Sequence, residues 1–260
     1  MTYSAFDYTV VAGAAAIAGL VNAIAGGGTL VSFPAMVAIG VPTKAANVTN
    51  TVALCPGYFG GAAAQRRDLA TQRHRARRLA IVSAIGGLAG SILLIITPED
   101  AFRASVPFLI LIACGLLASQ ETVRRWLRRH HPNGDVQVGR DTGPSVALSG
   151  TVCLSAVYGG FFGAGLGIML LAVLGLFLDD SLIRLNALKT TLSFVINVAA
   201  ALFFALSGQV EWPLVPVMAV ASLLGGAAGG RVARHMKPQV LRVIVVLFGV
   251  AVAIRFWVGT

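Results

Sequence analysis

Two groups of polar side chains lie inside long apolar stretches of this 260-residue chain. The first half contributes Asn47, Thr49, Asn50 and Thr51, and the second half contributes Asn186, Lys189, Thr190, Thr191, Ser193 and Asn197. Asn amides and Thr hydroxyls donate hydrogen bonds, and Lys189 is the only basic residue well inside an apolar stretch. An intramembrane cation is costly to bury and usually functional. Neutral donors with one cation and no carboxylate favour a binding site for an anion.

Each polar group follows an apolar stretch that is interrupted by glycines. In the first half Gly26, Gly27 and Gly28 are consecutive, with Asn22 before them and Pro34 after them. Each glycine disfavours a helix by about 1 kcal/mol relative to alanine, so three together predict a helix break. Broken backbone in a bilayer is tolerated only where it is buried in protein or lines a polar cavity. We interpret this stretch as a discontinuous intramembrane segment, with a close helix–helix contact as the alternative.

The two halves match each other at a fixed offset of 139 residues, as between Gly26 and Gly165 or Gly28 and Gly167. The same offset places Asn186 on Asn47 and Thr190 on Thr51, and it extends through the glycines of the next apolar stretch. The second glycine cluster differs from the first because its glycines are not contiguous and no proline follows them. One register held across a half of the chain predicts an internal repeat.

Composition places the chain in a membrane. Hydrophobic residues make up 57% of the sequence, charged residues make up 12%, and the mean hydropathy is +0.82. Several apolar stretches reach the ~20 residues that a spanning helix needs, so we expect an all-α polytopic membrane protein. The net charge of +10 does not indicate nucleic-acid binding. The basic residues gather in three short connections between apolar stretches, which is the pattern of a topology signal.

The positions of the basic connections predict an inverted repeat. If these connections are cytoplasmic, equivalent connections of the two halves face opposite sides of the membrane. Each half then consists of a broken re-entrant hairpin and three transmembrane helices, the plan of many secondary transporters. Both termini are expected outside. The predicted division is a first membrane repeat at 1–119, a basic cytoplasmic linker at 120–143 and a second, inverted repeat at 144–260.

Other classes of chemistry find little support in the sequence. All four histidines lie in the basic connections, and Cys55, Cys114 and Cys153 lie in apolar segments, so neither a metal site nor an intramembrane nucleophile–base pair is expected. No phosphate-binding loop of the G-x-x-x-x-G-K-[ST] type is present. We therefore expect no enzyme activity and no cofactor.

Four stretches together resemble a known family of permeases. They are Gly19-Leu-Val-Asn-Ala-Ile-Ala-Gly-Gly-Gly-Thr-Leu-Val-Ser-Phe-Pro34, Gly40-Val-Pro42, Ala46-Asn-Val-Thr-Asn-Thr51 and, in the second half, Arg184-Leu-Asn-Ala-Leu-Lys189. In this order they resemble the sulfite exporter TauE/SafE family, over nearly the whole chain. The resemblance implies a multi-pass carrier of the bacterial-type inner membrane that moves sulfite, organosulfonates or similar sulfur-containing oxyanions.

The polar groups and the glycine breaks together give a predicted binding site for a small anion between the two broken hairpins. Its predicted members are Asn22, Gly26, Gly27, Gly28, Asn47, Asn50, Thr51, Gly165, Gly167, Asn186, Lys189 and Thr190. Two alternatives stay open: the Lys189 stem can extend to the cytoplasmic surface, and Asn47 and Asn186 can join helices by hydrogen bonds worth ~0.6 kcal/mol each.

The mechanism is less constrained by the sequence than the site. An anion channel and a non-transporting membrane scaffold subunit stay open beside a secondary transporter. So do the coupling ion, H⁺ or Na⁺, and assembly into a homo-oligomer. The partners expected on the present reading are a small anionic substrate and the lipid bilayer, with no nucleic acid.

Overall fold

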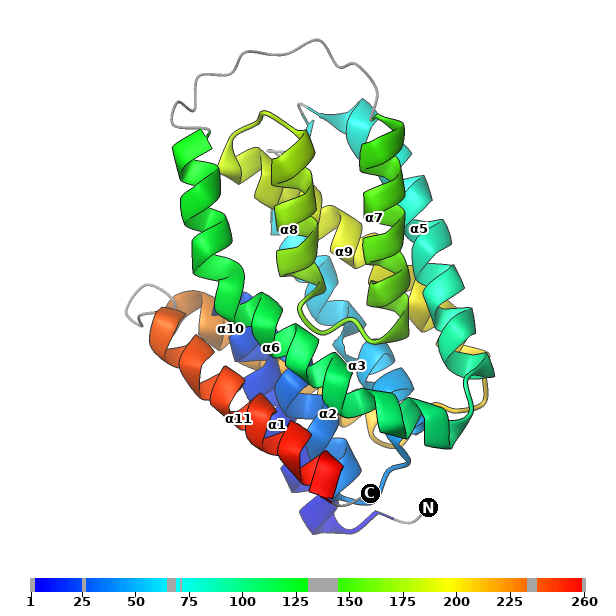
Figure 1. The fold of residues 1–260 in the computed structure, drawn as a ribbon. Coiled ribbons are helices and arrows are strands. Elements are labelled where there is room, and N and C mark those ends of the chain that lie inside the picture. Colours follow the sequence, from blue (N-terminus) through cyan, green and yellow to red (C-terminus); the bar gives the residue numbers. More distant parts are fainter. Residues whose placement is uncertain are drawn as a thin grey trace.

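The computed structural model describes residues 3–24, 27–64, 69–70, 72–130, 145–232 and 238–258. Within these ranges the chain forms ten α-helices and no strand (Figure 1). The helices are α1 (Ala5–Ile24), α2 (Thr29–Ala38), α3 (Thr43–Ala64), α5 (Arg73–Ile96), α6 (Glu99–His130), α7 (Val146–Phe161), α8 (Leu166–Phe177), α9 (Leu182–Ala205), α10 (Val215–Val232) and α11 (Pro238–Val258).

Five helices are long and apolar enough to cross a membrane, counting only the described residues. These spans are Ala5–Asn22, Arg73–Ile96, Glu99–Leu127, Leu182–Ala205 and Gln239–Trp257. The prediction of an all-α polytopic membrane protein is therefore confirmed. The first of these spans lies in α1, so the first arm of the expected hairpin is itself long enough to cross.

Two helix pairs turn back on themselves. In Figure 1, α1 starts at the end of the bundle where α11 also finishes, and α2 returns toward that end. The pair α7 and α8 starts and finishes at the opposite end, where α6 terminates. α2, which follows the first turn, lies against the second turning region, because the Phe33 and Phe162 rings meet edge to face with centroids 5.6 Å apart.

Glycines allow the closest helix packing in the bundle. α1 packs along α10, and α7 packs along α5. A Cβ at Gly19 of α1 would collide with the Ser222 carbonyl oxygen of α10, and a Cβ at Gly90 of α5 would collide with the Val157 carbonyl oxygen of α7. Backbones this close need small residues, which is the usual way that helices associate in lipid.

The sequence-based boundaries needed correction at the basic segments. Arg124 and Arg125, expected in a loop, belong to α6, which continues to His130. Arg73, one of the basic residues that the sequence places between apolar stretches, begins α5. Pro34 lies inside α2 and does not end it. The rest of the predicted linker, residues 131–144, lies outside the described residues, so the proposed division into repeats and linker remains a prediction.

Candidate functional site

The first helix break lies between α1 and α2, and a hydrogen bond to the Asn22 side chain stabilises it. Gly27 has a φ of +91°, a conformation that favours glycine. The next residue, Gly28, donates its backbone N–H to the Asn22 Oδ1 at 2.8 Å. A Cβ at Gly28 would collide with the Ala18 carbonyl oxygen of α1. Asn22 and Gly28 therefore stabilise the turn, and the contact between α1 and α2 is close. Gly26 lies outside the described residues.

The second helix break lies between α7 and α8 and is held from both halves of the chain. Gly163 and Gly165 have φ angles of +76° and +78°. The Tyr158 hydroxyl of α7 donates to the Ala164 carbonyl oxygen at 2.6 Å. The Asn47 Nδ2, on α3 of the first half, donates to the Phe161 carbonyl oxygen at 2.9 Å. Asn47 therefore stabilises the second break, since carbonyls in the last turn of a helix lack partners within it.

A small cavity lies between the two breaks, with room for about one water molecule. It is lined by Thr29, Asn50, Thr51, Leu54, Tyr58, Phe162, Gly163 and Asn197. Thr29 begins α2, Gly163 belongs to the second break, and the remaining polar residues lie on α3 and α9. Every polar side chain in this lining is neutral, so an anion bound here would be held by hydrogen bonds.

Asn50 is the most unusual residue of the cavity wall. It is only 2% exposed, and its Oδ1 is buried without a hydrogen-bond partner. Neither its amide nor the Tyr58 hydroxyl forms a hydrogen bond with any described residue. Asn197 Nδ2 donates to the Ser193 carbonyl oxygen at 2.8 Å. Buried polar groups are nearly always paired, so an unpaired amide oxygen in a cavity indicates a bound donor such as water.

The two predicted threonines have the same local contact in both halves. The Thr51 hydroxyl donates to the Asn47 carbonyl oxygen at 3.0 Å, and the Thr190 hydroxyl donates to the Asn186 carbonyl oxygen at 2.8 Å. Asn186 is half-buried on α9. Only Thr51 of these residues lines the cavity, so the two halves do not contribute equally to it.

Lys189 lies beside the start of α8 and not in the cavity wall. A Cβ at Gly167 would lie 3.6 Å from both the Cε and the Nζ of Lys189. Lys189 is half-buried, and it has no hydrogen bond or ion pair within the part of the chain that the structure describes. The side chain therefore packs against the first turn of α8, close to the second break.

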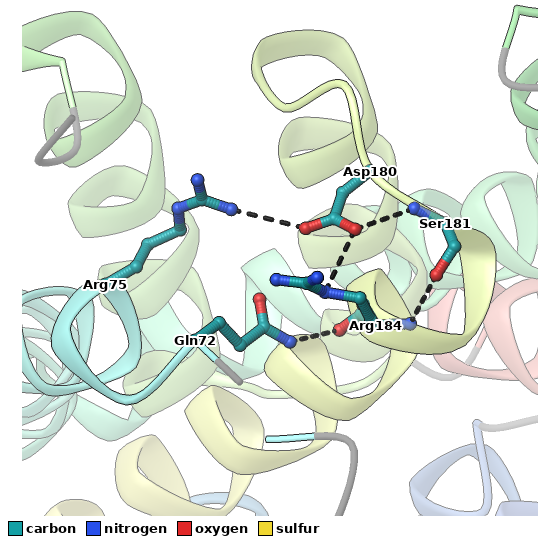
Figure 2. A network of polar contacts seen from close by, with 5 residues as sticks. All are labelled: Gln72, Arg75, Asp180, Ser181 and Arg184. Carbon is teal, nitrogen blue, oxygen red and sulfur yellow. Dashed lines mark hydrogen bonds and ion pairs between the residues drawn. The ribbon is translucent and has the colours of Figure 1, made fainter. Parts of the chain in front are cut away.

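A polar network fixes the start of α9, the helix that carries Asn186 and Lys189. Figure 2 shows Asp180 between two arginines: Arg75 Nη1 lies 3.3 Å from its Oδ2, and Arg184 Nε lies 3.1 Å from its Oδ1. The Gln72 Nε2 donates to the Arg184 carbonyl oxygen at 2.9 Å (Figure 2). Ser181 caps α9 by accepting from the Arg184 N–H at 3.4 Å. The network joins the first turn of α5 to the connection between α8 and α9.

The predicted site residues therefore do not form one cluster. Asn50 and Thr51 line the cavity, Gly167 and Lys189 lie side by side, and the remaining described members are Asn22, Gly27, Gly28, Asn47, Gly165, Asn186 and Thr190. Three polar lining residues, Thr29, Tyr58 and Asn197, were not among the predicted site residues. The 139-residue offset pairs Tyr58 with Asn197, so the internal repeat could have indicated these two residues.

The chain is similar to known membrane proteins along nearly its whole length. The family described as Sulfite exporter TauE/SafE matches residues 11–256. The probable membrane transporter protein ORF9 of Sinorhizobium sp is 31% identical over 247 residues, covering 93% of this chain and 89% of that protein. The probable membrane transporter protein YfcA of Escherichia coli strain K12 is 26% identical over 234 residues, covering 90% and 83%.

A third relative supports the same similarity. A probable membrane transporter protein of Haemophilus influenzae is 30% identical over 234 residues, which cover 89% of this chain and 87% of that protein. No solved structure matches the chain.

Proposed function

Because this chain belongs to the sulfite exporter TauE/SafE family of membrane transporters, we propose that it is a secondary transporter of small sulfur-containing oxyanions such as sulfite or organosulfonates. The anion binds in the cavity between the two helix breaks and reaches either side of the membrane in turn. The protein is a multi-pass protein of the bacterial-type inner membrane with both termini outside.

The observation that carries this proposal is the Asn50 amide, whose N–H donors line that cavity without a hydrogen bond to a described residue. Its side chain is 2% exposed, lines the cavity and makes no hydrogen bond with the described residues. The Asn50 amide and the Tyr58 hydroxyl both supply N–H or O–H donors to an occupant. These donors line the cavity without a hydrogen bond to a described residue, which suits a carrier whose substrate supplies the acceptors.

The small size of the cavity favours a carrier over a channel. It has room for about one water molecule, and Leu54 and Phe162 contribute apolar walls. An open channel needs a continuous polar path. A carrier passes through a closed state, and a cavity of this size suits such a state.

The halves are proposed to be inverted repeats. This is supported by element boundaries that recur at the offset: α9 begins at Leu182, 139 residues after α3 begins at Thr43, and α11 begins at Pro238, 139 residues after α6 begins at Glu99. It is also supported by helix contacts, because α1 with α10 and α7 with α5 are equivalent pairs under the same offset. The opposite directions of the two hairpins in Figure 1 agree with this plan.

The transport proposal is tested with purified protein in proteoliposomes. Uptake of labelled sulfite, methanesulfonate, sulfate and acetate is compared, with H⁺ and Na⁺ gradients imposed separately to identify a coupling ion. We expect saturable transport of sulfite or methanesulfonate. In Asn50→Ala the half-saturating concentration of the transported anion should rise. Transport of acetate alone, or of none of these anions, would overturn the substrate class.

The orientation has a separate test. In a background where the three native cysteines are replaced by alanine, single cysteines are placed at Ser207, in the turn after α9, and at His74, in the first turn of α5. A membrane-impermeant thiol reagent added outside should label the cysteine at position 207 and leave the one at position 74 unmodified. The reverse pattern would invert the proposed topology.

A further inference from the structure

The central cavity offers its occupant oxygen acceptors as well as donors. The Thr51 hydroxyl donates its hydrogen to the Asn47 carbonyl oxygen at 3.0 Å, so only its lone pairs are left for the cavity that Thr51 lines. The Asn50 Oδ1 is buried without a hydrogen-bond partner. Phe162 also lines the cavity, and its carbonyl accepts no hydrogen bond from a described residue. These oxygens offer lone pairs, which an anion cannot use.

A fourth oxygen of this kind lies beside the cavity on Asn47. Since a carbonyl only accepts, Asn47 must present its Nδ2 to the Phe161 carbonyl oxygen, and this 2.9 Å bond identifies the Oδ1 as the remaining atom. That oxygen is buried without a partner, and the side chain is 1% exposed. Asn47 and Asn50 are three residues apart on α3 and therefore share a face of the helix. This face of α3, which meets the second break, thus carries two buried and unpaired amide oxygens.

The end of α7 beside these oxygens favours positive charge. α7 ends at Phe161, and the C-terminus of a helix carries the negative end of the helix dipole and carbonyls without partners in the helix. Hard cations take oxygen ligands such as amide and backbone carbonyls, and in transporters Na⁺ is coordinated by backbone carbonyls where a helix is broken. The described lining of the cavity contains no carboxylate, which favours a monovalent over a divalent cation.

Charge balance gives such a cation a role in transport. The side chains that line the cavity are neutral. Lys189 precedes the lining residue Asn197 by two turns of α9, about 12 Å along the helix axis. An anion buried in a neutral cavity has no opposite charge there to offset its lost hydration. A bound cation supplies that charge, and the attraction between the two ions grows as the surrounding dielectric constant falls.

We propose that a Na⁺ site lies at the second helix break and that Na⁺ is the coupling ion for anion transport, an inference that rests on the proposed function. Its ligands are the four oxygens described above, from Asn47, Asn50, Thr51 and Phe162. The cavity has room for about one water molecule, so this closed state fits the cation alone, and the anion joins it when the cavity widens. Asn50 then serves both ions, with its oxygen toward Na⁺ and its N–H groups toward the anion.

Na⁺ binding is measured first without sulfite or sulfonate, as thermal stabilisation of the purified protein in detergent. NaCl is compared with KCl and choline chloride at equal ionic strength, since an ion that binds the folded state raises its melting temperature. We expect a saturable rise with NaCl that exceeds the rise with KCl. In Thr51→Val the half-saturating Na⁺ concentration should be about tenfold higher, whereas Thr51→Ser keeps the oxygen and should respond as the wild type does.

The matched control is Thr191→Val. The Thr191 hydroxyl donates to the Ala187 carbonyl oxygen at 3.0 Å, the same local contact that Thr51 makes, and Thr191 does not line the cavity. Its response to Na⁺ should therefore equal that of the wild type. If Thr51 had only a structural role, Thr51→Val would lower the melting temperature equally in NaCl and KCl and leave the half-saturating Na⁺ concentration unchanged.

Transport in proteoliposomes separates the Na⁺ site from the proposed function. An imposed Na⁺ gradient should drive sulfite or methanesulfonate transport, with about tenfold more Na⁺ needed for half-maximal transport in Thr51→Val. Anion transport that a pH gradient drives without Na⁺, or equal responses to NaCl and KCl, would overturn the Na⁺ site and leave the proposed function standing. The same holds if Thr51→Val and the wild type respond equally to Na⁺. Stabilisation by Na⁺ without transport of either anion would support the site and overturn the proposed function together with the coupling role.

Discussion

At both helix breaks a side chain forms a hydrogen bond with a backbone group, and the two breaks use different residues for this. The break between α1 and α2 is closed within its own hairpin, because Asn22 accepts the Gly28 N–H. The break between α7 and α8 uses Tyr158 of its own hairpin and also Asn47 of the other half. The second break therefore depends on the first half of the chain for one of its hydrogen bonds, whereas the hydrogen bond described at the first break lies within its own hairpin.

The side chains that follow the breaks differ in charge. Under the 139-residue offset Lys189 takes the place of Asn50, and Asn197 takes the place of Tyr58. Asn50, Tyr58 and Asn197 line the cavity, while Lys189 lies beside Gly167. The helix arrangement thus repeats in the two halves, but the charge of the side chains does not. Neutral donors line the central cavity, and the cation Lys189 lies toward one side of it. This difference predicts unequal behaviour of the two membrane faces.

The largest effect should come from the glycine that closes the first break. In Gly28→Ala the new methyl group collides with the Ala18 carbonyl oxygen, a backbone atom that cannot move aside. We expect loss of transport and a marked fall in thermal stability, since overpacking costs ~1–3 kcal/mol or more. Gly167→Ala, where the nearest atoms are the flexible Lys189 side chain at 3.6 Å, is the control and should be stable. Similar melting temperatures for the two variants would contradict this contrast.

Sequence patterns predicted the positions of both breaks because glycine acts locally, through backbone freedom and helix propensity. They did not predict which polar groups would remain free. Asn22 was expected in the cavity, but its oxygen is used by Gly28, a contact that depends on how the chain turns through Gly27. Tyr58 was not singled out because one aromatic residue in an apolar helix gives no local sign of the face it occupies.

The basic segments show a second limit of sequence patterns. Arginine is a good helix former, and a run of arginines marks a membrane boundary whether or not the helix stops there. Charge alone therefore placed Arg124 in a loop, although α6 continues past it to His130. The contact of Leu127 with Gly175 of α8 shows that this last part of α6 still packs against the bundle.

The second largest effect should come from replacing Lys189, the cation of the second half. Lys189→Ala should weaken anion binding by about 10- to 100-fold, because a hydrogen bond to a charged group contributes ~1.5–3 kcal/mol. Lys189→Arg should be partly tolerated, since a guanidinium is larger and differently hydrated than an ammonium. Substrate affinity in reconstituted vesicles is the measurement. If Lys189→Ala alters only expression or orientation and leaves affinity unchanged, the lysine extends to the surface and takes no part in binding.

The two asparagines that hold the breaks should affect stability more than binding. Asn22→Leu leaves the Gly28 N–H without its partner, and Asn47→Leu does the same to the Phe161 carbonyl. An unsatisfied buried group costs ~1–3 kcal/mol, and an orphaned N–H is tolerated less often than an under-satisfied carbonyl. Thermal unfolding in detergent should therefore show a larger loss for Asn22→Leu than for Asn47→Leu. A larger loss for Asn47→Leu would mean that the inter-half contact dominates.

The smallest effect separates two tyrosine hydroxyls that look alike in the sequence. The Tyr158 hydroxyl donates to the Ala164 carbonyl oxygen at 2.6 Å, whereas the Tyr58 hydroxyl lines the cavity and has no hydrogen bond to a described residue. Tyr158→Phe should therefore lower the melting temperature, because it leaves a buried carbonyl unpaired. Tyr58→Phe should leave stability unchanged, because the folded protein loses no internal hydrogen bond.

The same substitution at Tyr58 should weaken anion affinity by about 2- to 10-fold, the effect of one neutral hydrogen bond at ~0.5–1.5 kcal/mol. Melting curves and sulfite half-saturation are measured on both variants in the same preparation. Because Phe keeps the ring in both cases, a change in packing cannot account for the difference. A loss of stability in Tyr58→Phe with unchanged affinity would show that this hydroxyl serves the fold, and the cavity would then lose one of the donors assigned to its occupant.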